Sequence, residues 1–244
     1  KLQAIDRYAL LRWDRSLEGS VDVTPMLGPD DSVYVAGRRA FFAFSAEGEL
    51  KWRFETNAEF VADAALGADG SIYTATSDGT ICALDARGKL KWSSAVAGGM
   101  NGAPVLGPDG SLYLVDTAGS LHALDAQGQL RWSSTLARPL SPPFLDASGV
   151  VYTGSTDRRL YAFNSDGSPR WAAANTGAIK TALTQGPDGV FYFGTDDYRI
   201  VAANPDGGLR WAFATGFVVY STPALGGDGT VYCGGADRRF YALF

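Results

Sequence analysis

Residues suited to chemistry are few and isolated in this sequence. The chain has one histidine, His122, so neither a histidine-based catalytic triad nor a multi-histidine metal site can be assembled from it. The carboxylates of the "TDD" segment at 195–197 are isolated turn residues, and no glycine-rich phosphate loop precedes a helical segment. We therefore predict no catalytic residue and no metal site, and we interpret His122 as a buried strand residue.

The bulk composition excludes several classes of protein. The chain has 244 residues, of which 46% are hydrophobic, so it can bury a large core. Its net charge is −5 and its Lys and Arg residues are scattered, which argues against a nucleic-acid partner. No apolar run approaches the ~18–20 residues needed to span a bilayer. We expect a monomer without a transmembrane segment.

Three residue types recur in phase along the whole chain. Tryptophans stand at Trp13, Trp52, Trp92, Trp132, Trp171 and Trp211, at steps of 39 or 40 residues. Tyrosines keep the same step at Tyr34, Tyr73, Tyr113, Tyr152, Tyr192 and Tyr232, and so do alanines at Ala43, Ala83, Ala123, Ala162, Ala202 and Ala242. A fixed period of this length indicates a repeat architecture.

Each repeat is predicted to form four short strands, A to D. In the third repeat the segments 102–107, 111–115, 121–125 and 129–134 alternate apolar with polar residues, and Gly, Pro and Asp separate them. Four antiparallel strands every ~40 residues are typical of a β-propeller blade. We predict an all-β, six-bladed propeller in a single domain, residues 1–244, with blades at about 17–54, 55–94, 95–134, 135–173, 174–213 and 214–244 plus 11–16.

The turn before each tryptophan resembles a known family signature. Ala83, Asp85, Gly88, Lys89 and Trp92 match the tryptophan docking motif A-x-D-x-x-T-G-K-x-x-W, although the turn is one residue shorter and lacks the Thr. The chain thus resembles the PQQ-like β-propeller repeat of quinoprotein dehydrogenases and of non-enzymatic relatives such as the outer-membrane assembly lipoprotein. The resemblance implies that the six tryptophans are structural and pack between neighbouring blades.

The ends of the chain are expected to meet in one blade. The last repeat supplies strands A to C, and the segment around Trp13, residues 11–16, supplies the missing D strand, so that no sheet edge remains exposed. A second interpretation stays open, in which residues 1–5 are a redundant C strand and the chain comes from a ring of seven or eight blades. The cysteines, Cys82 and Cys233, fall in non-adjacent repeats, so we interpret them as buried thiols and not as a disulfide.

Two sets of residues vary on the face that carries the D–A and B–C loops. The first lies three residues before each A-strand proline position and includes the polar residues Asp22, Asn101, Lys180 and Tyr220, which are expected to converge near the axis. The alternative interpretation is that these loop positions accept many residue types, so that their side chains vary without a functional reason.

The second set is a basic arc in the B–C loops, made of Arg39, Arg159, Arg199 and Arg239, where the second and third repeats have Thr80 and Ser120. The preceding residues Arg38, Arg158 and Arg238 join this arc. Under the alternative interpretation these arginines are solvated and pair with Asp157, Asp197 and Asp237 of their own turns.

These patterns favour a non-catalytic scaffold that binds a protein segment or a small anionic ligand by this variable face. No cofactor is predicted. The first alternative is a quinone-dependent dehydrogenase, or its remnant, which would require PQQ and calcium; the second is a carbohydrate-binding propeller. An extracytoplasmic location, periplasmic or at the cell surface, is expected of a bacterial protein of this kind, with any signal or anchor removed.

Truncating a repeated tryptophan tests its structural role. Trp92→Ala is expected to lower the free energy of unfolding by about 3–5 kcal/mol, as truncations of packed aromatic residues do. Urea denaturation followed by circular dichroism measures this change. An unchanged denaturation midpoint would contradict the structural interpretation.

Overall fold

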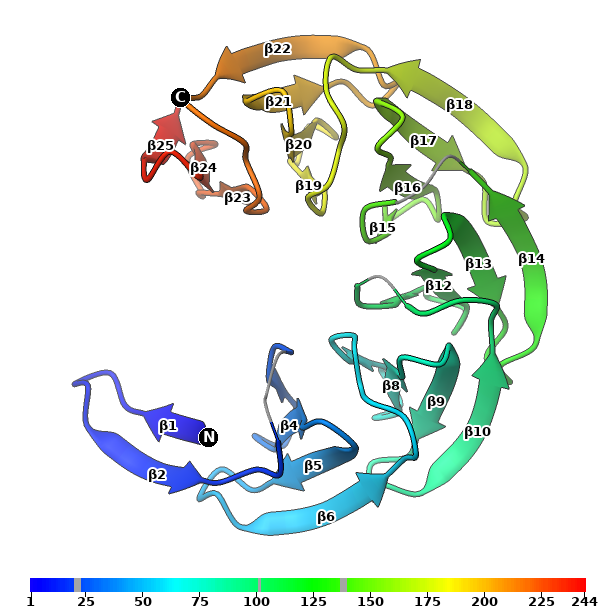
Figure 1. The fold of residues 1–244 in the computed structure, drawn as a ribbon, viewed down its shortest axis with the longest axis vertical. Coiled ribbons are helices and arrows are strands. Elements are labelled where there is room, and N and C mark those ends of the chain that lie inside the picture. The colour runs from blue at the N-terminus through cyan, green and yellow to red at the C-terminus, as the bar shows by residue number, and fades with distance from the viewer. Residues whose placement is uncertain (20–22, 101, 137–139) are drawn as a thin grey trace.

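Strands alone make up the regular structure of the described residues. The computed structural model describes residues 1–244 other than 20–22, 101 and 137–139. Within that part of the chain, no helix is long and apolar enough to cross a membrane. The strands fall into seven antiparallel sheets arranged around a common axis (Figure 1).

Five sheets have four strands each, in the order A-B-C-D. They are sheet 1 (β3–β6), sheet 2 (β7–β10), sheet 3 (β11–β14), sheet 4 (β15–β18) and sheet 5 (β19–β22). The terminal sheet (β23–β25) has strands A to C, and the N-terminal hairpin (β1–β2) has strands C and D.

The strands have closely similar lengths from one sheet to the next. The A strands are β3 (Met26–Leu27), β7 (Ala65–Leu66), β11 (Val105–Leu106), β15 (Phe144–Leu145), β19 (Thr184–Gln185) and β23 (Ala224–Leu225). The B strands are β4 (Val33–Ala36), β8 (Ile72–Ala75), β12 (Leu112–Val115), β16 (Val151–Gly154), β20 (Phe191–Thr195) and β24 (Val231–Gly234). The C strands are β1 (Leu2–Ile5), β5 (Ala40–Phe44), β9 (Thr80–Leu84), β13 (Ser120–Leu124), β17 (Arg159–Phe163), β21 (Arg199–Ala203) and β25 (Phe240–Leu243). The D strands are β2 (Leu11–Arg15), β6 (Leu50–Glu55), β10 (Leu90–Ala95), β14 (Leu130–Thr135), β18 (Pro169–Ala174) and β22 (Leu209–Ala214).

One cross-strand rung explains the three repeated residue types. In sheet 2, Tyr73 lies opposite Ala83, and Ala83 lies opposite Trp92. The two rings meet over the alanine with their centroids 5.9 Å apart, and Ala83 is 0% exposed. A larger side chain in its place would collide with the rings, so alanine is required there. The same tyrosine–tryptophan contact occurs in all five complete sheets, at 5.8–6.0 Å.

Four of the indoles also donate a hydrogen bond to the next sheet. The Trp92 Nε1–H donates a hydrogen bond to the Ala126 carbonyl in the C–D turn of sheet 3, at 3.0 Å. Gly128 of that turn has φ +81°, and a Cβ built on it would lie 2.4 Å from the indole. Trp13, Trp52 and Trp132 make the equivalent hydrogen bond at 2.8–3.0 Å. The buried core lies between neighbouring sheets, as in the cluster that joins Ile81 to Leu112 and Leu114.

A second contact closes four of the five complete sheets along the outer strand. In sheet 2 the A–B turn residue Asp69 accepts hydrogen bonds from the hydroxyl and amide of Ser71, and the Lys91 ammonium of the D strand lies 3.1 Å from its carboxylate. These donors hold the pKa of Asp69 at about 2. Lys51–Asp30, Arg131–Asp109 and Arg210–Asp188 are the counterparts in sheets 1, 3 and 5.

The predicted closure of the ring by the N-terminal strand is wrong. β2 pairs with β1, with Trp13 opposite Ala4, and β25 pairs with β24 alone. Figure 1 shows a gap in the ring between the N-terminal hairpin and the terminal sheet. Residues 2–5 form the redundant C strand of the second interpretation, because their pairing with β2 satisfies the D strand without the terminal sheet.

The two cysteines are buried free thiols, as predicted. They belong to different sheets, since Cys82 lies in β9 and Cys233 in β24. Burial raises the pKa of Cys82 to about 11. His122 is buried in β13, as predicted, and its Nε2 lies 2.9 Å from Oδ2 of Asp116, which is also buried.

A matched pair of glycine substitutions isolates the indole contact. Gly128→Ala and Gly149→Ala both place alanine at a positive φ, +81° and +82°, but a Cβ at Gly149 meets nothing within 4 Å. Both variants carry the left-handed penalty of about 1–2 kcal/mol. Gly128→Ala is expected to cost about 1–3 kcal/mol more, because its methyl group overpacks Trp92. Equal denaturation midpoints for the two variants would contradict the docking role of the indole.

The lowered pKa of the turn carboxylate Asp69 predicts that the protein loses stability in acid. The folded pKa of Asp69 is about 2, below its ordinary value of 3.8, so its contribution is present above about pH 4 and is lost as the pH falls through about 2. Urea midpoints measured at pH 5, 3 and 2 are expected to decrease in that order. Asp69→Asn, which cannot be protonated in this range, should flatten part of this dependence; an identical pH profile would contradict the assignment.

Candidate protein-interaction face

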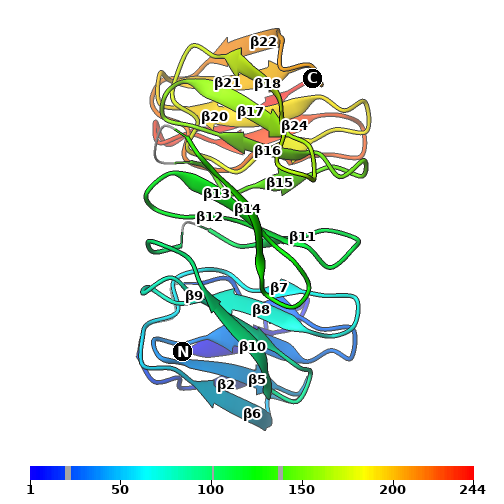
Figure 2. The same ribbon diagram turned by 90° about the vertical axis from the view of Figure 1, so that its right-hand side faces the viewer.

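Loops collect on two opposite sides of the sheets (Figure 2). On one side lie the B–C loops and the D–A connections, and backbone hydrogen bonds join them, as from Thr215 N–H to the Tyr198 carbonyl at 2.8 Å. We call this side the variable face, because its residues differ between sheets. The A–B and C–D turns lie on the other side and are close copies of one another.

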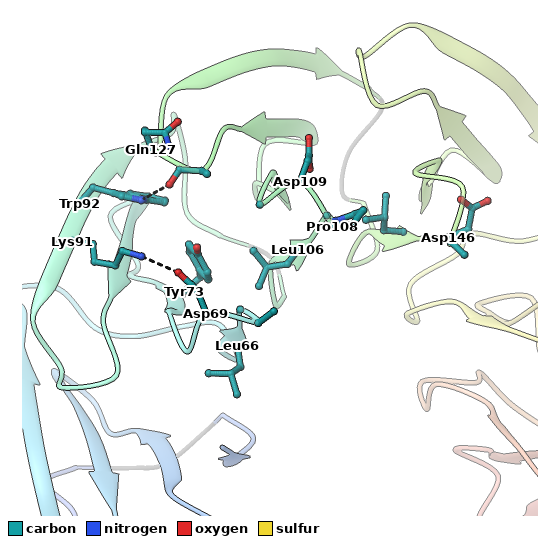
Figure 3. Close-up of a pocket in the computed structure, with 17 residues that line it drawn as sticks. Leu66, Asp69, Tyr73, Lys91, Trp92, Leu106, Pro108, Asp109, Gln127 and Asp146 are labelled. Carbon is teal, nitrogen blue, oxygen red and sulfur yellow. Dashed lines mark hydrogen bonds and ion pairs between the residues drawn. The ribbon is translucent and has the colours of Figure 1, made fainter. Parts of the chain in front are cut away.

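A groove on the side of the copied turns is built from parts that also hold the sheets together. It has a volume of about 1140 Å³ and runs between the turns of sheets 2, 3 and 4 (Figure 3). Its polar lining includes the Lys91–Asp69 ion pair and the docked indole of Trp92. Since these groups are already paired, the groove presents little free hydrogen-bonding capacity to a ligand.

The structure describes two of the four residues in the predicted polar set. Asp22 and Asn101 lie outside the described residues. Lys180 is exposed and its Nζ lies 4.0 Å from Oδ2 of Asp196, and Tyr220 is 64% exposed. No hydrogen bond or ion pair joins Lys180 to Tyr220 in the described part of the chain, so their convergence stays a prediction.

The basic arc needs two corrections. Arg39 is not equivalent to the other arginines, because Ala40 pairs with Glu55 at the position where Thr80 pairs with Ala95. The β4–β5 loop is one residue shorter than its counterparts, which moves Arg39 out of the strand. The open ring also separates Arg39 from Arg239, so the arc is confined to sheets 4 and 5 and the terminal sheet.

The turn aspartates of these sheets serve their own turns. Asp157 accepts hydrogen bonds from the Arg159 amide and the Tyr161 hydroxyl, and Asp237 does the same with the Arg239 amide and the Tyr241 hydroxyl. Burial, reinforced by the bond to Asp157, raises the pKa of Tyr161 to about 12. Pairing of arginine with the turn aspartate is found for Arg199, whose Nε lies 3.4 Å from Oδ2 of Asp197.

In sheet 4 and the terminal sheet, four guanidinium groups on this face are therefore exposed without an ion-pair partner among the described residues. They belong to Arg158, Arg159, Arg238 and Arg239. Their charges point to solvent while the neighbouring carboxylates are held in the turns.

Three large side chains occupy positions that favour glycine. Sheets 2 and 3 have Gly79 and Gly119 at the left-handed position of the B–C turn, whereas the later sheets have Arg158, Tyr198 and Arg238 there, with φ of +65° to +68°. A non-glycine residue in this conformation costs roughly 1–2 kcal/mol. Arg158 and Arg238 were expected in the basic arc, but their left-handed backbone and the matching position of Tyr198 were not predicted, although the Asp-Gly and Ala-Gly turns of the second and third repeats were a usable signal.

An exposed aromatic pair lies beside these arginines. The rings of Tyr198 and Phe217 stack with centroids 5.3 Å apart at 12°, and they are 44% and 48% exposed. Together with Arg158, Arg159, Arg199, Arg238 and Arg239 they form what we call the basic-aromatic surface.

Calcium and a quinone are the cofactors that the first alternative function would require. The described residues contain no group of three or more His, Cys, Asp or Glu side chains placed to hold a metal ion. The two cysteines lie in separate sheets and not side by side. We derive no chemical step through either group.

Comparisons with known proteins agree with the repeat and its geometry. The family profile described as outer membrane protein assembly factor BamB matches residues 2–141 and 117–244. No curated protein sequence matches the chain. The crystal structure of BamB from Moraxella catarrhalis superposes with a TM-score of 0.65 at 18% identity, over 97% of this chain and 89% of that one. The crystal structure of the computationally designed Ika8 protein superposes with a TM-score of 0.84 at 14% identity, over 97% of this chain and 75% of that one.

These matches confirm the β-propeller architecture and cover the whole length of the sequence. The chain belongs to the PQQ-like repeat family of the outer membrane protein assembly factor BamB.

Proposed function

We propose that this chain is a non-catalytic scaffold that recognises an acidic protein segment through the basic-aromatic surface. Membership of a family described as an assembly factor supports protein binding in general. It also supports the inference that the protein works outside the cytoplasm, at the outer membrane named in the family description.

The observation that carries the proposal is the strained turn position. Arg158, Tyr198 and Arg238 retain long side chains where glycine would relieve backbone strain. Strain of this kind concentrates at functional sites because the side chain is needed there. Here the side chains that accept it are exposed cations and an exposed ring, the residue types that are enriched in protein interfaces.

Acidic partners suit the charges of this surface. Arg158, Arg159, Arg238 and Arg239 are free to pair with carboxylates, and the planar guanidinium can hold a carboxylate through two hydrogen bonds. The Tyr198–Phe217 pair offers an apolar platform between them. An extended segment with alternating acidic and apolar side chains would satisfy both features.

Replacing three arginines of the basic-aromatic surface tests the proposal. A triple variant, Arg159→Ser, Arg199→Ser and Arg239→Ser, introduces the residue found at Ser120. It should change the free energy of unfolding by only ~0–1 kcal/mol, because the one ion pair that it removes, Arg199–Asp197, is exposed. In pull-downs from an extract of the source cell at two salt concentrations, the wild type is expected to retain salt-sensitive partners that the triple variant loses.

The control variant removes positive charge from the opposite side, two cations against the three of the triple variant. Arg87→Ser with Lys89→Ser removes two exposed cations from a C–D turn and should leave the partner profile unchanged. Identical profiles for the wild type and the triple variant would refute the proposal.

A further inference from the structure

The single histidine of the chain belongs to a buried polar pair in sheet 3. Nε2 of His122 lies 2.9 Å from Oδ2 of Asp116, and the two side chains are 8% and 2% exposed. The other carboxylate oxygen, Oδ1, accepts the Ser120 amide at 2.8 Å. Nδ1 of His122 is buried and has no hydrogen-bond partner among the described residues. Burial of a carboxylate and of an unpartnered ring nitrogen costs free energy, so packing alone does not account for this pair.

Other sheets make the same contact with a different ring. The third residue of the C strand lies opposite the B strand in a common register, at Phe42, Cys82, His122, Tyr161, Val201 and Tyr241. In sheet 4 and the terminal sheet this residue is a tyrosine whose hydroxyl donates to the aspartate of the B–C turn. Sheet 3 thus repeats a contact between a C-strand ring and a carboxylate.

Sheet 3 takes its carboxylate from another position. Its B–C turn has Ala118 where sheets 2, 4 and 5 have the turn aspartate. Asp116 lies two residues earlier, at the isolated bridge where those sheets have the hydroxyl residues Thr76, Ser155 and Thr195. Both partners of the contact have therefore been exchanged together.

The exchange replaces a contact of fixed charge with one that titrates. The pKa of Tyr161 is raised to about 12, chiefly by burial and further by its bond to Asp157, so this phenol keeps its proton at neutral pH. An imidazole in water exchanges its second proton near pH 6.5, in the range where the phenol does not respond.

The pair lies beside a connection of the variable face. Residues 96–100 lead from β10 to sheet 3 and are bound there by two backbone contacts. The Thr117 amide donates to the Gly99 carbonyl at 2.7 Å, and Met100 forms an isolated bridge with Asp116 itself. A change at the Asp116 side chain therefore acts on the residue that holds this connection.

The neighbouring sheet supplies no counter-charge to the pair. His122 lies opposite Leu114, which packs in the apolar cluster between sheets 2 and 3. Tyr73 is the one titratable side chain of that cluster. The charged group of the adjacent B–C turn is Asp78, whose carboxylate accepts the Thr76 hydroxyl within its own turn.

The connection and the outer strand supply none either. Residues 96–100 carry no charged side chain, and β14 places Ser133 opposite His122. The cation of β14, Arg131, pairs with Asp109 of the A–B turn. In the described part of the chain, the imidazole is therefore the only group that forms an ion pair with the Asp116 carboxylate.

We propose that the Asp116–His122 pair is a proton-dependent clasp that holds residues 96–100 against sheet 3. When both ring nitrogens carry a proton, the imidazolium compensates the buried carboxylate. When Nδ1 loses its proton, Nε2 keeps its own for the hydrogen bond, and the carboxylate is left as an uncompensated buried charge. The clasp is thus closed at weakly acidic pH and loosens as the pH rises past neutrality.

This device is independent of the proposed partner site. The clasp belongs to sheets 2 and 3, whereas the basic-aromatic surface belongs to sheets 4 and 5 and the terminal sheet. The arginine triple variant should keep the pH response of the wild type, so failure of one proposal can be distinguished from failure of the other.

Amide hydrogen exchange of the full chain at pH 5.5 and 8.0, corrected for the exchange rates of unstructured peptides, tests the clasp. We expect protection of residues 96–100 and 116–122 to be about tenfold lower at pH 8.0, while β20 and β21 of sheet 5 keep the same protection. The window isolates the histidine. It lies above the range in which Asp69 takes up a proton, and burial raises the pKa of both cysteines.

The matched control installs the arrangement of sheet 4 in sheet 3. A variant with Asp116→Ser, Ala118→Asp and His122→Tyr copies Ser155, Asp157 and Tyr161, and should show equal protection at both pH values. The NMR signal of the single imidazole reports its charge in the wild type, so this reading does not depend on the folding of the variant. We expect a charged ring at pH 5.5.

Three results would overturn the proposal. They are wild-type protection that is equal at the two pH values or higher at pH 8.0, a pH response that persists in the variant, and an imidazole that is neutral at pH 5.5.

Discussion

The tyrosine–alanine–tryptophan rung is the contact on which the rest of this structure depends. It sets the register of the B, C and D strands in each sheet, because only alanine fits between the two rings. The same indole reaches the next sheet, where it donates a hydrogen bond to a turn carbonyl and lies against a glycine with a positive φ. One residue per repeat therefore organises both the sheet and the ring.

This use of the tryptophans leaves the two sides of the molecule with different roles. The A–B and C–D turns are held by repeated ion pairs and indole contacts, such as Asp69 with Lys91, and cannot vary without loss of stability. The B–C loops keep the hydrogen bonds of their turn aspartates but not the repeated ion pair to the D strand, so their other side chains differ between sheets. Cations and aromatic rings gather there on sheets 4 and 5 and the terminal sheet, while the aspartates that would neutralise the cations are occupied by turn amides and tyrosine hydroxyls.

The sequence by itself determined the repeat, the strands within each repeat, the burial of the cysteines and His122, and the alanine beside each tryptophan. These features follow from the alternation of apolar and polar residues and from a spacing of 39 or 40 residues, both of which are visible in the sequence. Only the tertiary structure decided whether the ring closes, because closure depends on the angle between packed sheets, and that angle is not encoded in any single repeat. It also decided that Arg39 lies outside the register of Arg159, since a loop shorter by one residue shifts every position before the strand. The pairing of Tyr198 with Phe217 was equally inaccessible, because the two rings come from different loops that meet only when the sheets are packed.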